Sequence, residues 1–213
     1  MKRILLILCI LTSLLLITGC QVETKSEITS SNEVQEMQDT NSESKILDFG
    51  VWEDGIYKND FLDFNIQIPS DWSKTSDEEL ARIIELGTEA VYGEASNVKL
   101  DSINNGVLMN AKGIEGNINI AFDKNLYNLT KEEYNSALNG NFLNLDNMEY
   151  NLTEDKLVYI EGIPFSCMKY YVNTDGITLK QSIYTREING YFFTVTLTSV
   201  AEELDINDFI VKK

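Results

Sequence analysis

Two glycine-containing turns in the last third of the chain constrain its fold more than any other feature. Asp175-Gly176 separates an alternating apolar run, 165–172, from a second run, 177–188, and Asn189-Gly190 separates that run from a third, 191–200. Such dipeptides adopt the positive φ angles that two-residue turns between antiparallel strands require. The sequence therefore predicts a three-stranded antiparallel unit near the C-terminal end.

A two-residue turn at Asn189-Gly190 also fixes which side chains share a face. It places Tyr184 opposite Val195 and Ser182 opposite Leu197, so that each face carries both apolar and polar residues. A sheet with one face in water would show a cleaner alternation. We therefore expect an α+β fold in which helices cover both faces of an antiparallel β-sheet.

The preceding residues supply further strands and helices. Residues 62–68 alternate apolar and polar side chains up to Pro69, which predicts a half-buried strand. Ser76 with Glu79, and Thr130 with Glu133, have the spacing of capping boxes at helix starts. Further strands are expected at 55–58, 107–112, 117–123, 147–152 and 156–160, and helices at 77–86, 131–138 and 202–210.

The first twenty residues have the pattern of an export signal. Lys2 and Arg3 precede an apolar run, 4–17, which is shorter than the roughly 20 residues that a transmembrane helix needs. The run ends at Ile17-Thr18-Gly19-Cys20. This pattern resembles the bacterial lipoprotein signal, which implies cleavage before Cys20 and diacylglycerol on its thiol. We favour this interpretation over a plain secretory signal, and expect the mature chain to be lipid-anchored on the extracytoplasmic face of the cell membrane.

Three segments are expected. Residues 1–19 form the signal peptide, and 20–46 hold the lipidated cysteine and an acidic tether rich in Ser, Thr, Glu, Gln and Asn. Such a composition cannot bury enough apolar surface to offset the cost of ordering the backbone, so we expect the tether to be disordered. Residues 47–213 then form a single globular domain of ordinary size.

The charge and composition of the chain exclude several classes of function. It carries 17 Lys and Arg against 34 Asp and Glu, and loss of 1–19 with Lys2 and Arg3 changes the net charge from −17 to −19. A surface this acidic disfavours nucleic acid, because phosphate binding needs cationic side chains. The chain has no histidine, which removes Ser-His-Asp systems and His-ligated zinc. We expect no cofactor, no metal and no catalytic residue.

The cysteines predict neither a disulfide nor a catalytic thiol in the mature chain. Cys9 leaves with the signal and Cys20 receives the lipid, so Cys167 has no partner for a disulfide in the mature chain. Cys167 lies within an alternating strand, where we expect a buried apolar side chain; the alternative is a reactive thiol, which needs a cationic and accessible setting.

One segment resembles a known family. A short strand beginning at Tyr57 leads into the alternating strand and then Ile68-Pro69-Ser70-Asp71-Trp72, followed by a capped helix. This order resembles the PsbP-like domains, which include an extrinsic subunit of the plant oxygen-evolving complex and lipoproteins of Gram-positive bacteria. The resemblance implies an α/β/α sandwich and a role in docking or assembly. Because this chain lacks histidine, no His-dependent metal site is carried over.

Three cations form the candidate docking face. Paired through the two turns, Lys169, Lys180 and Arg186 fall on one face of the three strands, among tyrosines. In an acidic chain, such a cationic edge is a place for an acidic partner to bind, an unidentified protein or another component of the cell envelope. The alternative is that these cations protect an edge strand from aggregation.

Other candidates have simpler explanations. Trp72 is expected to cover the core, with sugar stacking as the alternative. The acidic residues Asp71, Asp77, Glu78 and Glu79 favour a helix start through its dipole, with a weak calcium contact as the alternative.

The leading interpretation is therefore a non-catalytic binding or assembly module. The alternative is a cell-envelope hydrolase that uses a pair of carboxylates. A solute-binding component of a transporter is disfavoured, because one domain of this size is too small for two hinged lobes.

Overall fold

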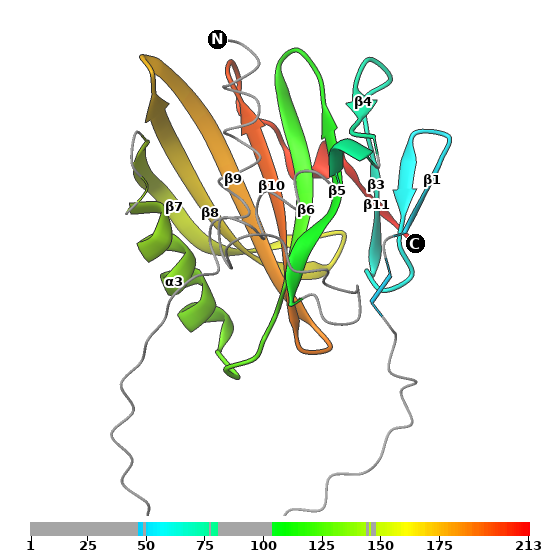
Figure 1. Cartoon of the computed structure of the whole chain (residues 1–213), viewed down its shortest axis with the longest axis horizontal. Helices are drawn as coiled ribbons and strands as arrows, with labels where there is room; N and C mark the ends of the chain where they lie inside the picture. Colours follow the sequence, from blue (N-terminus) through cyan, green and yellow to red (C-terminus); the bar gives the residue numbers. More distant parts are fainter. Residues whose placement is uncertain (1–46, 49, 77, 81–103, 144, 146–147) are drawn as a thin grey trace, which may run out of the picture.

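The computed structural model describes residues 47–48, 50–76, 78–80, 104–143, 145 and 148–213 (Figure 1). The predicted signal, the lipid attachment at Cys20, the tether and part of the helix predicted at 77–86 lie outside these residues. Within them, no helix is long and apolar enough to cross a bilayer.

The core of the fold is a seven-stranded antiparallel sheet. Its spatial order is β4-β5-β6-β10-β9-β8-β7. The strands β4 to β6 form one antiparallel set and β7 to β10 another, and the pairing of β6 with β10 joins the two sets into one sheet. The strands are β4 (Ser73–Lys74), β5 (Asn105–Lys112), β6 (Gly116–Lys124), β7 (Glu149–Ile160), β8 (Ile163–Thr174), β9 (Ile177–Ile188) and β10 (Tyr191–Ser199).

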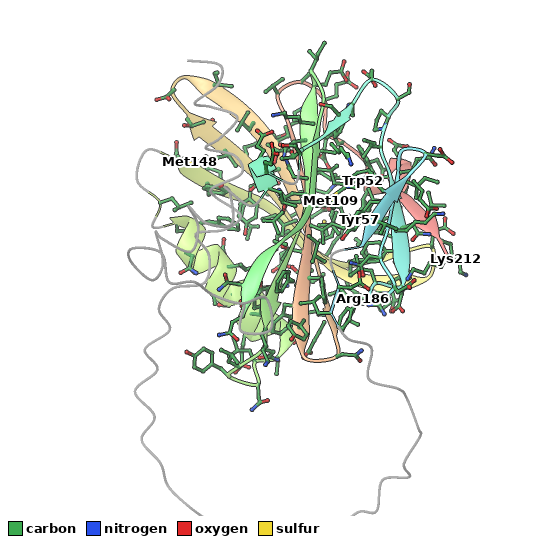
Figure 2. All side chains as sticks on the ribbon, turned by 45° about the vertical axis from the view of Figure 1, so that its right-hand side comes forward. Trp52, Tyr57, Met109, Met148, Arg186 and Lys212 are labelled. Carbon is green, nitrogen blue, oxygen red and sulfur yellow. The ribbon has the colours of Figure 1, made fainter. Side chains whose placement is uncertain are left out.

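A second, four-stranded sheet packs on one face of the large sheet. Its order is β1-β2-β3-β11, with bounds Val51–Glu53, Ile56–Lys58, Phe64–Gln67 and Ile210–Lys212. The apolar layer between the sheets joins Tyr57, Phe64 and Ile66 to Met109 and Phe193 (Figure 2). These side chains are almost fully buried, so this layer supplies much of the apolar burial that stabilises the fold.

Helix α3 (Lys131–Leu143) covers the opposite face. Its inward side chains, Tyr134, Leu138 and Phe142, pack with Tyr170 and Phe192 of the sheet in a separate core. The expected α/β/α sandwich with helices on both faces is therefore wrong. Both faces are covered, as the mixed side-chain pattern indicated, but one cover is a helix and the other is the small sheet.

The turn prediction is confirmed in detail. Asp175 and Gly176 have φ of 48° and 78°, and Asn189 and Gly190 have 49° and 78°, as a type I′ turn requires. Tyr184 pairs with Val195, and Ser182 with Leu197. The predicted edge is wrong, however, because β8 and β9 each have a strand on both sides.

The helix predictions differ in outcome. Thr130 and Glu133 form a complete capping box: Glu133 N–H donates to Thr130 Oγ1 at 3.2 Å, and Thr130 N–H donates to Glu133 Oε2 at 2.8 Å. The predicted helix thus begins as expected but continues to Leu143. Residues 78–80 are helical, capped by Ser76 Oγ. The helix expected at 202–210 is wrong, since a short 3₁₀ turn, η3 (Ile206–Asp208), leads there into β11.

Candidate functional site

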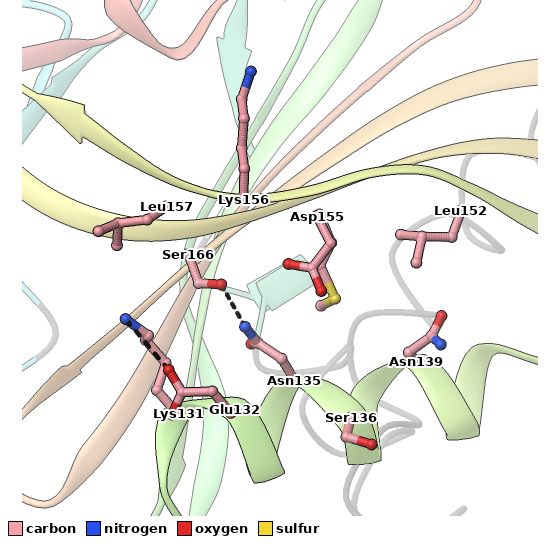
Figure 3. A pocket seen from close by; sticks show the side chains of 11 residues that line it. Lys131, Glu132, Asn135, Ser136, Asn139, Leu152, Asp155, Lys156, Leu157 and Ser166 are labelled. Atoms are coloured by element: carbon pink, nitrogen blue, oxygen red, sulfur yellow. Dashed lines mark hydrogen bonds and ion pairs between the residues drawn. The ribbon is translucent and has the colours of Figure 1, made fainter.

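A groove of about 390 Å³ lies between α3 and the strands β7 and β8 (Figure 3). This volume is within the range of small-ligand sites in proteins, roughly 300 to 1,000 Å³. One wall is the helix, the other is β7, and Ser166 and Met168 of β8 form the floor. The groove is therefore built by elements far apart in the sequence.

The helix wall presents amides instead of apolar side chains. Asn135 and Asn139 lie four residues apart, which places them on the same side of α3. Asn135 is buried and donates from Nδ2 to Ser166 Oγ at 2.5 Å. Asn139 accepts at Oδ1 from the Tyr170 hydroxyl at 3.1 Å. These two bonds hold both amides against the sheet.

One amide atom remains unsatisfied. Asn135 Oδ1 is buried and has no hydrogen-bond partner within the part of the chain that the structure describes. A buried acceptor without a partner costs about 1–3 kcal/mol. A ligand with an N–H or O–H group would remove this cost only after the Asn135 side chain turned this oxygen toward the groove, because the atom has almost no accessible surface.

The strand wall combines apolar side chains with the carboxylate of Asp155 and with Lys156, whose ammonium pairs with Glu154 at 2.7 Å. The pairing of β7 with β8 shifts between Leu152 and Glu154, and this irregularity lets Leu152, Asp155 and Leu157 all line the groove. The two leucines are 43% and 51% exposed, which is high for such residues in a strand. Asp155 has no ion-pair partner among the described residues.

The carboxylates of Glu132 and Asp155 lie on opposite walls of the groove (Figure 3). Glu132 is 4.0 Å from the Lys131 ammonium and is largely exposed. Burial raises the pKa of the Tyr170 hydroxyl well above its ordinary value, and the nearby charge of Asp155 adds to this shift. The groove therefore holds acidic, basic, amide and apolar groups together, the basic ones being Lys131 and Lys156.

The three predicted docking cations do share one face, but two of them are neutralised within the chain. Lys169 pairs with Glu203, and with Glu154 at 3.5 Å. Arg186 pairs with Asp63 at 2.6 Å. Lys180 lies opposite Tyr171 and has no ion-pair partner among the described residues. A docking role for these residues stays a prediction.

The remaining candidates lie in structural settings. Cys167 is fully buried, and burial raises the pKa of its thiol to about 11, which disfavours the reactive thiolate. Trp72 is partly buried and packs on Phe209, with ring centres 5.4 Å apart. Within the described residues, no group of three acidic or cysteine side chains is placed to hold a metal ion.

A second cavity, of about 80 Å³, holds an unusual carboxyl group. Asp123 lines it together with Asn104, Asn125 and Tyr134, near the end of β6. Burial raises the pKa of Asp123 to about 7. Neither this cavity nor the groove was predicted from the sequence. The feature that could have indicated the groove is the pair Asn135 and Asn139, two amides on one side of α3 next to its apolar side.

No protein-family model matches the chain, and no curated protein matches it. Among solved structures it is similar to the cyanobacterial PsbP protein (CyanoP) of Synechocystis sp. PCC 6803, at 12% identity over 68% of this chain and 79% of that one, with a TM-score of 0.41. It is also similar to a protein from Bacteroides thetaiotaomicron, at 13% identity over 71% and 45%, with a TM-score of 0.38. Likenesses at this level imply no activity or partner.

Proposed function

We propose that this protein is a lipid-anchored, extracytoplasmic binding module of Gram-positive bacteria, which holds its ligand in the groove between α3 and β7 and catalyses no reaction. The anchor is supported by the Ile17-Thr18-Gly19-Cys20 pattern after a cationic start and an apolar run. The binding role is supported by the groove, and above all by the unsatisfied Asn135 Oδ1.

The choice of residue at 135 favours binding over stability. Leucine has the branched shape of asparagine without its polar atoms, although it is the larger side chain, and the nearby core on this side of the sheet, which includes Leu138 and Met168, is apolar. It would also remove an unsatisfied buried acceptor, which is destabilising. A ligand that completes the hydrogen bonds of Asn135 would account for a polar group at this position of the groove.

A photo-crosslinking side chain at Ser136 tests this proposal in the native membrane. Ser136 lines the groove, whereas Ile114, which is 96% exposed in the turn between β5 and β6, serves as the control position. We expect a crosslinked species from position 136 that is absent from position 114. Equal crosslinking at both positions, or none at 136, would contradict a ligand site in the groove.

A matched pair of variants links the captured species to Asn135. Asn135→Leu should reduce capture at least about tenfold, since one charge-free hydrogen bond and its desolvation are together near 1.4 kcal/mol. Asn110→Leu is the control: Asn110 is also buried, bonds Thr75 Oγ1 at 2.6 Å and has an unsatisfied Oδ1, but lies on β5. Loss of capture in both variants would mean a general structural effect.

A hydrolase is the second candidate, because Glu132 and Asp155 lie on opposite walls of one groove. Two carboxyl groups across a cleft are the minimum for glycoside hydrolysis. Incubation with purified cell-wall polysaccharide should release no reducing ends above the blank. Release by the native protein that is lost in the variant Glu132→Gln, Asp155→Asn would replace the binding proposal with an enzyme.

A further inference from the structure

We infer that the ligand of the groove is an extended, basic peptide segment that adds a strand to the outer edge of β7. This inference rests on the proposed function, because it assigns the chemical class of the ligand that the groove holds. It follows from three features of β7: its position in the sheet, the direction of its backbone groups, and the side chains that it presents.

β7 is the last strand on its side of the large sheet (Figure 1). It is 12 residues long and pairs with β8 along its inner edge, and no described strand pairs with its outer edge. A long unpaired edge presents a row of backbone donors and acceptors, and proteins usually shorten or cover such edges. Peptide recognition by strand addition uses an edge of this kind.

The β7–β8 turn fixes which backbone groups point outward. Glu161 and Gly162 have φ of 51° and 79°, so the turn is of type I′ and Ile160 pairs with Ile163 across it. The closing pair of such a turn bonds inward, and the direction alternates along the strand. The N–H and C=O groups of Asp155, Leu157 and Tyr159 therefore point away from β8.

The same three residues place their side chains on the groove side. Asp155 pairs with Met168 and Leu157 with Ser166, and both partners form the groove floor. Asp155 and Leu157 thus combine outward backbone groups with side chains that line the groove, and Tyr159 continues the same outward edge beyond it. A strand added to this edge would lie along the mouth of the groove.

The side chains specify the peptide. Leu152, Leu157 and Tyr159 are 43%, 51% and 68% exposed, which favours apolar side chains on the added strand. The lysines that line the groove, Lys131 and Lys156, lie beside carboxylates of their own, Glu132 and Glu154. Asp155 lacks an ion-pair partner within the described residues, which favours a lysine or arginine opposite it. The net charge of −17 also steers cationic segments toward this chain.

Charge argues against two other occupants of the edge. A second copy of the chain would bring a strand with three carboxylates and one ammonium, Glu149, Glu154, Asp155 and Lys156, against an identical, net acidic strand. Residues 21–46 of this chain carry more acidic than basic residues. A basic partner segment is therefore the occupant that the chemistry of the edge selects.

The test uses short synthetic peptides and the full-length protein in detergent, with binding measured by fluorescence anisotropy. The probe is a peptide of alternating lysine and valine. One control peptide replaces each lysine with glutamate, and another is N-methylated at every second residue on its bonding edge. We expect binding of the probe, and at least about tenfold weaker binding of each control, since each loses the charge pairing or several backbone hydrogen bonds.

Two variants of one residue separate backbone pairing from side-chain contact. Leu157→Pro removes an outward N–H, and an edge position of this kind tolerates proline. Leu157→Thr keeps that N–H and has a high preference for strands. We expect binding of the peptide to be lost in Leu157→Pro. We expect it to weaken only about two- to fivefold in Leu157→Thr, because threonine removes part of one apolar contact and keeps the backbone hydrogen bond. Equal effects of the two variants would overturn strand addition.

The outcomes separate this inference from the proposed function. If photo-crosslinking at Ser136 captures a species but the lysine–valine peptide does not bind, or binds equally well when N-methylated, the groove binds another class of ligand and the inference is wrong. A dimer of the native protein in sedimentation experiments that Leu157→Pro abolishes would also overturn it, because the edge would then hold a second copy.

Discussion

Arg186 donates from Nη2 to Oδ2 of Asp63 at 2.6 Å, although 123 positions separate the two residues in the sequence. Arg186 belongs to β9 in the large sheet, and Asp63 directly precedes β3 in the small sheet. The ion pair therefore connects the two sheets beside the apolar layer between them, because Arg186 pairs with Phe193 and Asp63 adjoins Phe64, both of which belong to that layer. Arg186, which the sequence predicted to bind an acidic partner molecule, thus pairs with an acidic residue of its own chain.

A double-mutant cycle should reveal this connection. Arg186→Leu and Asp63→Asn should show a coupling energy of about 0.5–1 kcal/mol in urea unfolding, because both side chains are partly exposed and water weakens their attraction. The pair Lys58 and Glu53, at 2.5 Å on the surface within one hairpin, is the control and should couple more weakly. A coupling of zero for Arg186 and Asp63 would mean that the pair contributes nothing to joining the sheets.

Local signals predicted the C-terminal strands well, because their pairing depends on two adjacent turns. Asn189-Gly190 sets the register of β9 and β10 through backbone conformations that few other dipeptides adopt. Likewise, Thr130 and Glu133 fix where α3 begins. No comparable signal marks the end of α3, where the sequence continues through Gly140 to Leu143 without a stop.

The strands β2 and β3 of the small sheet were predicted, but their assembly into a separate sheet was missed, because the other two strands carry almost no local pattern. β1 and β11 each have three residues, too few to show an alternation. β11 exists because Ile210 pairs with Ile66, a contact between the two ends of the domain that no sequence window contains. The same limit applies to the groove, since Asn135 and Ser166, which bond each other in it, are 31 positions apart in the sequence. The mixture of apolar and polar side chains on each face of the large sheet indicated that both faces were covered. It did not distinguish a cover of helices from a cover of strands.

Close packing at Gly113 gives a prediction on stability. A Cβ atom there would lie 2.3 Å from Nε1 of Trp72, whose ring is held against Phe209. Gly113→Ala should therefore lower the free energy of unfolding by about 1–3 kcal/mol, as overpacking usually does. Gly140→Ala is the control: a Cβ in that helical position meets nothing within 4 Å, so alanine should stabilise by about 0.5–1 kcal/mol. Equal effects of the two variants in urea unfolding would contradict the packing of Trp72.

The lipid anchor can be tested at Cys20. Cys20→Ala should abolish metabolic lipid labelling and leave the unprocessed precursor on a gel, because the thiol that receives diacylglycerol is gone. Cys167→Ala is the matched control, since the Cys167 thiol is buried in the core and unable to accept a lipid. Lipid labelling that survives in Cys20→Ala would refute the anchor. That result would leave the proposal of a binding groove untouched, because the two rest on different parts of the chain.

The carboxyl group of Asp123 predicts an unusual dependence of stability on pH. Burial raises its pKa in the folded protein to about 7 from 3.8. The folded chain then holds more protons than the unfolded chain between these values, so this residue makes stability fall as the pH rises from about 4 to about 7. Asp123→Asn cannot ionise and should be the more stable protein at about pH 8, with little difference at about pH 4.

The size of this effect follows from the pKa shift. A shift of one unit corresponds to 1.36 kcal/mol, so the full shift would give up to about 4 kcal/mol. Because Asp123 is only partly buried and water reaches its carboxyl group, we expect a gain on the order of 2 kcal/mol for Asp123→Asn above about pH 7. Urea unfolding of both proteins across this range measures the difference and cancels the contributions of all other titrating groups. A difference that stays constant with pH, or a carboxyl-carbon NMR titration of Asp123 with a midpoint near 4, would show that this carboxyl group is solvated in the folded protein.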